Sequence, residues 1–75
     1  MNKEQIAITT GFIKLGDLLK FSGIAESGGQ AKEFILDQIV SVNSEICIER
    51  GKKIYPGYIV FIDIEDGFEL EVTAQ

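Results

Sequence analysis

The stretch Ser27-Gly28-Gly29-Gln30-Ala31-Lys32 opens a helix with a capping residue, two glycines and a lysine. The Ser27 hydroxyl is placed to accept a hydrogen bond from the backbone N–H of Gln30, and the Gln30 side chain to reach back to the N–H of Ser27. This capping box fixes where the helix begins. The glycines leave first-turn N–H groups open to an anion, and the lysine adds a full charge. The alternative is a well-capped helix whose glycines only allow close packing.

Two short helices are predicted, one on each side of residues 23–26. The first follows from leucines at helical spacing in residues 15–22, and Gly23 ends it. The second runs from the Ser27 cap to about Gln38 and buries one stripe of side chains, Ala31, Phe34, Ile35 and Ile39. The two helices are therefore expected to form a compact pair.

Strands are expected on both sides of the helices. An alternating run over residues 6–10 predicts the first strand. Asn43-Ser44 is a tight-turn signal, and Pro56-Gly57 suits the middle of a type II turn. The remaining strands are expected over residues 40–42, 46–48, 58–64 and 68–72. The predicted fold class is therefore α+β.

Length and composition limit the possible functions. The 75 residues, 45% apolar and 25% charged, predict one globular domain over residues 1–75. No apolar run is long enough for a membrane span or a signal peptide, so we expect a cytoplasmic protein without a membrane partner. A lone cysteine excludes an internal disulfide, and the absence of histidine removes most metal centres and acid–base pairs. We therefore expect no catalytic residue, no metal and no cofactor.

The net charge of −5 is unevenly distributed. Residues 11–62 hold six basic and six acidic side chains, which cancel. The excess lies in a tail that contains Asp63, Glu65, Asp66, Glu69 and Glu71. An acidic protein can therefore still carry a local basic surface. The acidic C-terminal strand, in residues 63–75, is expected at the edge of the sheet, where charge discourages pairing between molecules.

The segment Arg50-Gly51-Lys52-Lys53 places three cations in four residues at a predicted strand end. Taken alone, it also fits a solvated turn. Together with Lys20, Lys32 and the open helix start it makes a basic patch, provided that the hairpin packs beside the second helix. This arrangement favours a binding module over an enzyme.

The order of these motifs resembles the RNA-binding domain named after small-subunit ribosomal protein S-four, and within it the small stand-alone bacterial proteins of the YaaA and YbcJ type. The resemblance covers about residues 13–62 and is carried by residues 15–20, 27–32, 40–43, 50–54 and 56–57. It implies an αL-type fold, with two short helices packed on a small, mostly antiparallel sheet. It also implies binding of structured RNA, ribosomal or transfer RNA, with a role in ribosome assembly or function and contact with ribosomal particles. We expect the protein to be a monomer.

The resemblance also implies which residues bind RNA. Carried over by position, they are Lys20, Ser27, Gly28, Gly29, Gln30, Lys32, Asn43, Arg50, Gly51, Lys52 and Lys53. Such a site would hold phosphates with backbone N–H groups and lysines, and would recognise RNA largely by shape.

Three positions depart from the family pattern. Ser44 replaces a glycine after the asparagine, and Tyr58 replaces an aspartate and is expected to cover the core. Glu49 stands where a second arginine is common, so it should weaken phosphate attraction beside Arg50. Glu49 and the acidic tail leave an alternative open. In it, the domain keeps its fold and contacts a basic protein partner through its acidic C-terminal face.

Overall fold

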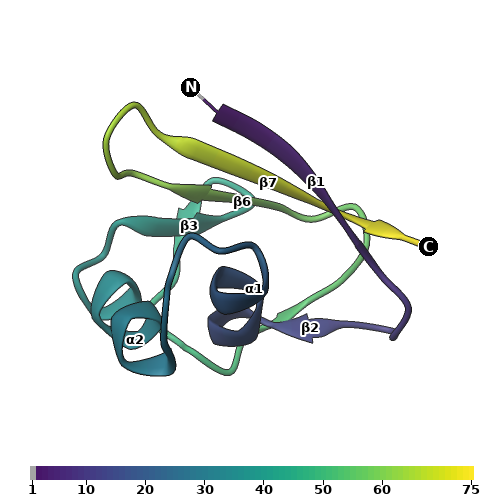
Figure 1. The fold of residues 1–75 in the computed structure, drawn as a ribbon, viewed down its shortest axis with the longest axis horizontal. Helices are drawn as coiled ribbons and strands as arrows, with labels where there is room; N and C mark the ends of the chain where they lie inside the picture. The colour runs from purple at the N-terminus through teal and green to yellow at the C-terminus, as the bar shows by residue number, and fades with distance from the viewer. Residues whose placement is uncertain (1) are drawn as a thin grey trace.

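The computed structural model describes residues 2–75. Two helices cover one face of a five-stranded sheet, and a two-stranded sheet lies beside the first helix (Figure 1). The elements are, in chain order, β1 (Asn2–Ile8), β2 (Ile13–Lys14), α1 (Leu15–Phe21), α2 (Gly28–Leu36), β3 (Val40–Val42), β4 (Glu45–Ile46), β5 (Lys53–Ile54), β6 (Ile59–Ile62) and β7 (Phe68–Ala74). This is the predicted α+β arrangement.

The large sheet has the strand order β1-β7-β6-β3-β4, and β1 pairs with β7 in parallel while the other neighbours are antiparallel. The expectation that the acidic C-terminal strand forms an edge is wrong, because β7 lies between β1 and β6. All seven residues of β1 pair with β7, which also explains why β1 begins earlier than the alternating run 6–10 indicates. The edges of the sheet are β1 and β4.

Most predicted elements are present, and they differ from the prediction mainly in the residues where they begin or end. Both predicted helices are confirmed, although α2 stops at Leu36 with Asp37 as its C-cap. The Asn43-Ser44 turn is confirmed, because both residues have positive φ angles, 50° and 75°, as a tight turn between β3 and β4 requires. The predicted strand over residues 46–48 is shorter, since β4 ends at Ile46.

The two-stranded sheet was not predicted. Its strands β2 and β5 hold two residues each, which is too short for a periodic pattern. They pair antiparallel, with Ile13 opposite Ile54 and Lys14 opposite Lys53. This pairing brings the chain before α1 next to the basic segment that the sequence places after β4.

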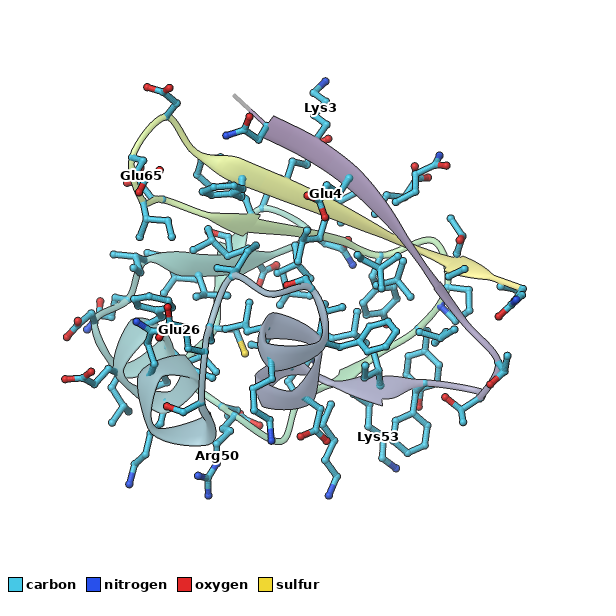
Figure 2. The ribbon with its side chains drawn as sticks, in the orientation of Figure 1. Lys3, Glu4, Glu26, Arg50, Lys53 and Glu65 are labelled. Atoms are coloured by element: carbon cyan, nitrogen blue, oxygen red, sulfur yellow. The ribbon has the colours of Figure 1, made fainter. Side chains whose placement is uncertain are left out.

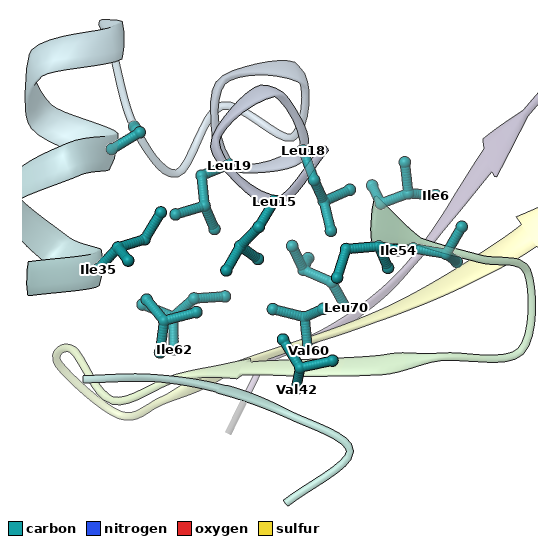
Figure 3. Close-up of a cluster of buried hydrophobic side chains, with 14 of the residues drawn as sticks. Ile6, Leu15, Leu18, Leu19, Ile35, Val42, Ile54, Val60, Ile62 and Leu70 are labelled. Atoms are coloured by element: carbon teal, nitrogen blue, oxygen red, sulfur yellow. The ribbon is translucent and has the colours of Figure 1, made fainter. Parts of the chain in front are cut away.

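The hydrophobic core lies between the helices and the large sheet (Figure 3). From α1 the fully buried side chains are Leu15, Leu18 and Leu19. They meet Ile35 of α2 and a layer of sheet residues that includes Val40, Val60, Ile62, Leu70 and Val72. Tyr58 packs against this core as predicted. Because a domain this small has a single core, its stability depends on a few buried leucines.

Replacement of Leu19 by alanine should destabilise the domain by about 2–5 kcal/mol, because the side chain is fully buried and leaves a cavity. Chemical denaturation followed by circular dichroism measures this change. The matched control is Phe21→Ala on the same helix, whose ring is 67% exposed. That variant should stay within about 0.5 kcal/mol of the unmodified chain. Equal losses in the two variants would contradict the assignment of the core.

Candidate nucleic-acid interface

The start of α2 is capped as predicted, with one difference. Ser27 is extended, with φ −149° and ψ 167°, and its Oγ accepts from the N–H of Gln30 at 3.1 Å. The Gln30 side chain was expected to accept from the N–H of Ser27. It instead accepts from the N–H of Glu26 at 2.6 Å, within the bend formed by residues 24–27. The cap therefore satisfies one N–H before the helix and one inside it.

The first turn of α2 keeps two free donors. The N–H groups of Gly28 and Gly29 have no acceptor within residues 2–75. A Cβ built on Gly28 would lie 4.0 Å from Nζ of Lys20, so this lysine of α1 stands beside the open turn. Lys20 also pairs with Asp17 at 3.6 Å, an exposed ion pair that contributes little energy. Free N–H groups, the positive helix end and a lysine together suit a phosphate.

Two backbone hydrogen bonds attach the basic segment to α1. The first N–H groups of the helix donate to it, Leu15 to the carbonyl of Lys52 at 2.8 Å and Gly16 to the carbonyl of Arg50 at 3.0 Å. A Cβ on Gly16 would lie 2.7 Å from Cγ of Arg50. Glycine at this position therefore lets the Arg50 side chain lie against the helix. The segment also lies beside α2, because Arg50 and Gly51 line one hollow with Gly28 and Ala31. Its backbone hydrogen bonds, however, go to α1.

These elements enclose a hollow of about 360 Å³, called here the basic hollow. It is lined by Lys14, Gly16, Asp17, Lys20, Gly28, Ala31, Arg50 and Gly51. Residues of β2, both helices and the basic segment thus meet at one place. In Figure 2, Arg50 and Lys53 lie on the edge of the molecule below the helices, on the side opposite Lys3 and Glu65.

Lys14 is a cation of the site that no sequence motif includes. It lines the basic hollow and lies directly opposite Lys53 in the β2–β5 pair. Nζ of Lys53 stands 4.9 Å from the centroid of the Phe12 ring, so an aromatic face helps to hold this cation. The only sequence signal for Lys14 was its place directly before the first helix. Its proximity to Lys53 depends on a pairing that has no sequence pattern.

A second hollow of about 360 Å³ lies on the other side of the basic segment, between it and the β3–β4 turn. Asn43, Glu49 and Lys52 line it. Asn43 has a structural task here, because its Oδ1 accepts from the N–H of Ile59 at 2.9 Å and its own N–H donates to the Ile59 carbonyl at 2.8 Å. Cys47 also lines this hollow, half-buried, with Sγ 3.7 Å from the carbonyl oxygen of Glu49.

The predicted site residues thus fall into separate groups. Lys20, Gly28, Arg50 and Gly51 meet at the basic hollow, and Asn43 and Lys52 meet at the second hollow. Ser27, Gly29 and Gln30 form the start of α2 without lining either hollow. Lys32 is exposed on α2 and also lines neither hollow.

Five cations lie along one edge of the molecule: Lys14, Lys20, Arg50, Lys52 and Lys53. Of these, only Lys20 has a carboxylate partner within residues 2–75. Within residues 2–75 its pair with Asp17 is the one ion pair present. The same residues contain no group of three or more potential metal ligands, and no helix among them is long and apolar enough to cross a membrane. The chemistry that this edge offers is the binding of an extended anion.

Comparison with known proteins gives matches over most of the chain. The family model for the S4 domain matches residues 6–72. The chain is also 40% identical over 65 residues to the protein described as "Probable ribosome maturation protein RlbA" of Bacillus subtilis (strain 168), a match that covers 87% of this chain and 92% of that protein. The motifs, the fold and these matches agree, and the chain belongs to the S4 domain family.

Proposed function

We propose that this protein binds structured ribosomal RNA, without catalysis, through a basic edge formed by Lys14, Lys20, Arg50, Lys52 and Lys53 together with the start of α2. The observation that carries the proposal is the basic hollow, where three cations from three separate elements meet a helix start with free N–H groups. Membership of the S4 domain family supports RNA as the ligand. The name of the Bacillus relative supports a role in ribosome maturation.

The groups on this edge suit phosphate better than base edges. Lysine and arginine side chains and backbone N–H groups are the donors that proteins most often direct at the sugar–phosphate backbone. Phosphate contacts position a protein on RNA, and double-stranded RNA is recognised mainly by its shape. We therefore expect the protein to bind a folded RNA surface, and its affinity to depend little on the sequence of the base pairs that it contacts.

Binding to ribosomal RNA should fall steeply with salt. If about five phosphates are neutralised, the slope of log K against log salt should be roughly −3.5 to −4.5. Lys52→Glu/Lys53→Glu should lower affinity at least about tenfold and reduce the slope by about two. Fluorescence anisotropy with a labelled ribosomal RNA fragment measures both quantities, and transfer RNA serves as a competitor of different shape.

A control of matched charge separates a local effect from the net charge. Lys52→Gln/Lys53→Gln and Asn2→Asp/Gln75→Glu each lower the net charge by two, but the second pair lies at exposed positions outside the basic edge. Only the lysine variant should lose affinity strongly. A flat salt response by the folded wild type, or equal losses in the two variants, would refute the proposal.

Lys14 should contribute to the same surface even though the sequence motifs omit it. Lys14→Gln is expected to weaken RNA binding about threefold to tenfold, because it removes one phosphate contact. Lys3→Gln removes the same charge from an exposed position on β1, on the opposite side of the molecule, and should leave binding nearly unchanged (Figure 2). Anisotropy titrations at one low salt concentration compare the two. An unaffected Lys14→Gln variant would place the binding surface elsewhere.

Gly16→Ala tests the position of Arg50 without changing any charge. The added Cβ meets Cγ of Arg50 at 2.7 Å, so the arginine side chain must move away from the helix. RNA affinity should fall severalfold. Thermal or urea unfolding should change little, since alanine favours a helix by about 1 kcal/mol over glycine and offsets part of the repacking cost.

The matched control for this substitution is Gly11→Ala. Gly11 has no atom within 4 Å of its built Cβ and has no positive φ. This variant should bind RNA as the wild type does. If Gly16→Ala also binds RNA normally while remaining folded, Arg50 does not act from its position against α1.

A further inference from the structure

The face of the large sheet turned away from the helices is uncovered (Figure 1). Its side chains alternate along each strand with the buried residues of the core. This outer sheet face is defined by Lys3, Gln5, Ser41, Ile46, Ile59, Phe61, Glu69 and Glu71. No element within residues 2–75 packs over it. The RNA-binding proposal leaves this surface unused.

The residues of this face form continuous rows across the strands. One row runs from Glu69 on β7 to Phe61 on β6, Ser41 on β3 and Ile46 on the edge strand β4. Ile46 is 59% exposed, and Phe61 is partly exposed. Apolar side chains thus lie in line beside a carboxylate.

The neighbouring row repeats this pattern one step along the strands. Glu71 on β7 lies opposite Ile59 on β6 and opposite Gln5 on β1, whose Nε2 donates to the Glu71 carboxylate at 3.1 Å. Two rows therefore combine apolar side chains from β6 and β4 with carboxylates from β7. Lys3 on β1 lies opposite Glu69 on β7. In the described part of the chain these two side chains form no ion pair.

The charge of this face decides which occupant fits it. An RNA or an anionic lipid surface would be repelled by Glu69 and Glu71, and by the acidic turn between β6 and β7 that contains Asp63, Glu65 and Asp66. A second copy of the same face would place these carboxylates against one another. A chain that carries both cations and apolar side chains is complementary to both parts of the surface.

We propose that the outer sheet face binds a lysine- and arginine-rich segment of a second protein, whose apolar side chains contact Ile46, Ile59 and Phe61 and whose cations contact Glu69 and Glu71. The basic edge and this face point in different directions, so RNA and protein can be bound together (Figure 2). The inference does not depend on the proposed RNA site, because none of its residues belongs to the basic edge. Ile46 is the residue closest to that edge, since it also lines the second hollow with Lys52.

The test is a titration of the ¹⁵N-labelled 75-residue chain with a defined peptide. The probe is a twelve-residue peptide of alternating lysine pairs and leucine pairs, which in an extended strand puts both residue types on each face. The comparison peptide replaces every leucine by serine at equal charge. The first peptide should bind at least about fivefold more tightly, because apolar contact adds to charge attraction. Its chemical-shift changes should concentrate on β3, β4, β6 and β7. Equal affinity for both peptides, or changes that concentrate on the helices, would overturn the proposal.

Variants test the same surface from the protein side. Glu69→Gln/Glu71→Gln should weaken the lysine–leucine peptide about fivefold to tenfold. The charge-matched control is Glu33→Gln/Asp37→Asn, which removes two exposed carboxylates near the end of α2 and should leave affinity within about twofold. Equal weakening by both pairs would mean general attraction to an acidic protein and would refute a specific face.

Two further measurements distinguish the outer sheet face from the basic edge and from a dimer interface. Ile46→Ser changes a residue that is 59% exposed and should weaken the peptide without unfolding the domain. Lys52→Glu/Lys53→Glu should leave peptide affinity no weaker than in the wild type, so loss of RNA binding and loss of peptide binding are distinguishable. Sedimentation of the free protein should give a monomer, and a dimer abolished by Ile46→Ser would assign the face to a second copy instead.

Discussion

The arrangement of the candidate site depends on the two hydrogen bonds between the start of α1 and the basic segment. The first N–H groups of a helix have no partner within the helix and must find one elsewhere. Here Leu15 and Gly16 donate to the carbonyls of Lys52 and Arg50. The hydrogen bonds that these two N–H groups need therefore fix the backbone of the basic segment, residues 50–53. At the start of α2, in contrast, the N–H groups of Gly28 and Gly29 have no acceptor within residues 2–75 and can donate to a ligand.

Much of the fold could be predicted from the sequence because its signals are local. The Ser27 cap, the leucine spacing of α1 and the Asn43-Ser44 turn each involve a few neighbouring residues, and each is confirmed. The order of strands in the sheet is different, because it depends on contacts between residues far apart in the chain. The alternating acidic and apolar residues of β7 fit a strand, but they do not indicate whether two neighbours cover its edges.

The candidate site was predictable in part for the same reason. The cations of the basic segment and the glycines of α2 belong to short motifs, so they could be named from the sequence. Lys14 could not, because its place depends on its pairing with Lys53 across a sheet of two-residue strands. Asn43, in contrast, was named as a site residue but has a structural role. It was assigned to RNA on resemblance, and the structure gives its side-chain oxygen a bond to the backbone of β6, so that its amide group alone remains for a ligand.

An acidic protein can present a basic surface only if its charges are kept apart. The molecule measures 30 × 24 × 23 Å, whereas charges in physiological salt are screened over about 8 Å. Carboxylates on the outer sheet face therefore reduce the potential at the basic edge only weakly. Glu49 is closer, but it lines the hollow of Lys52 and not that of Arg50. Its negative charge is expected to act mainly on Lys52, whereas the hollow shared by Lys14, Lys20 and Arg50 holds three cations against the one carboxylate of Asp17.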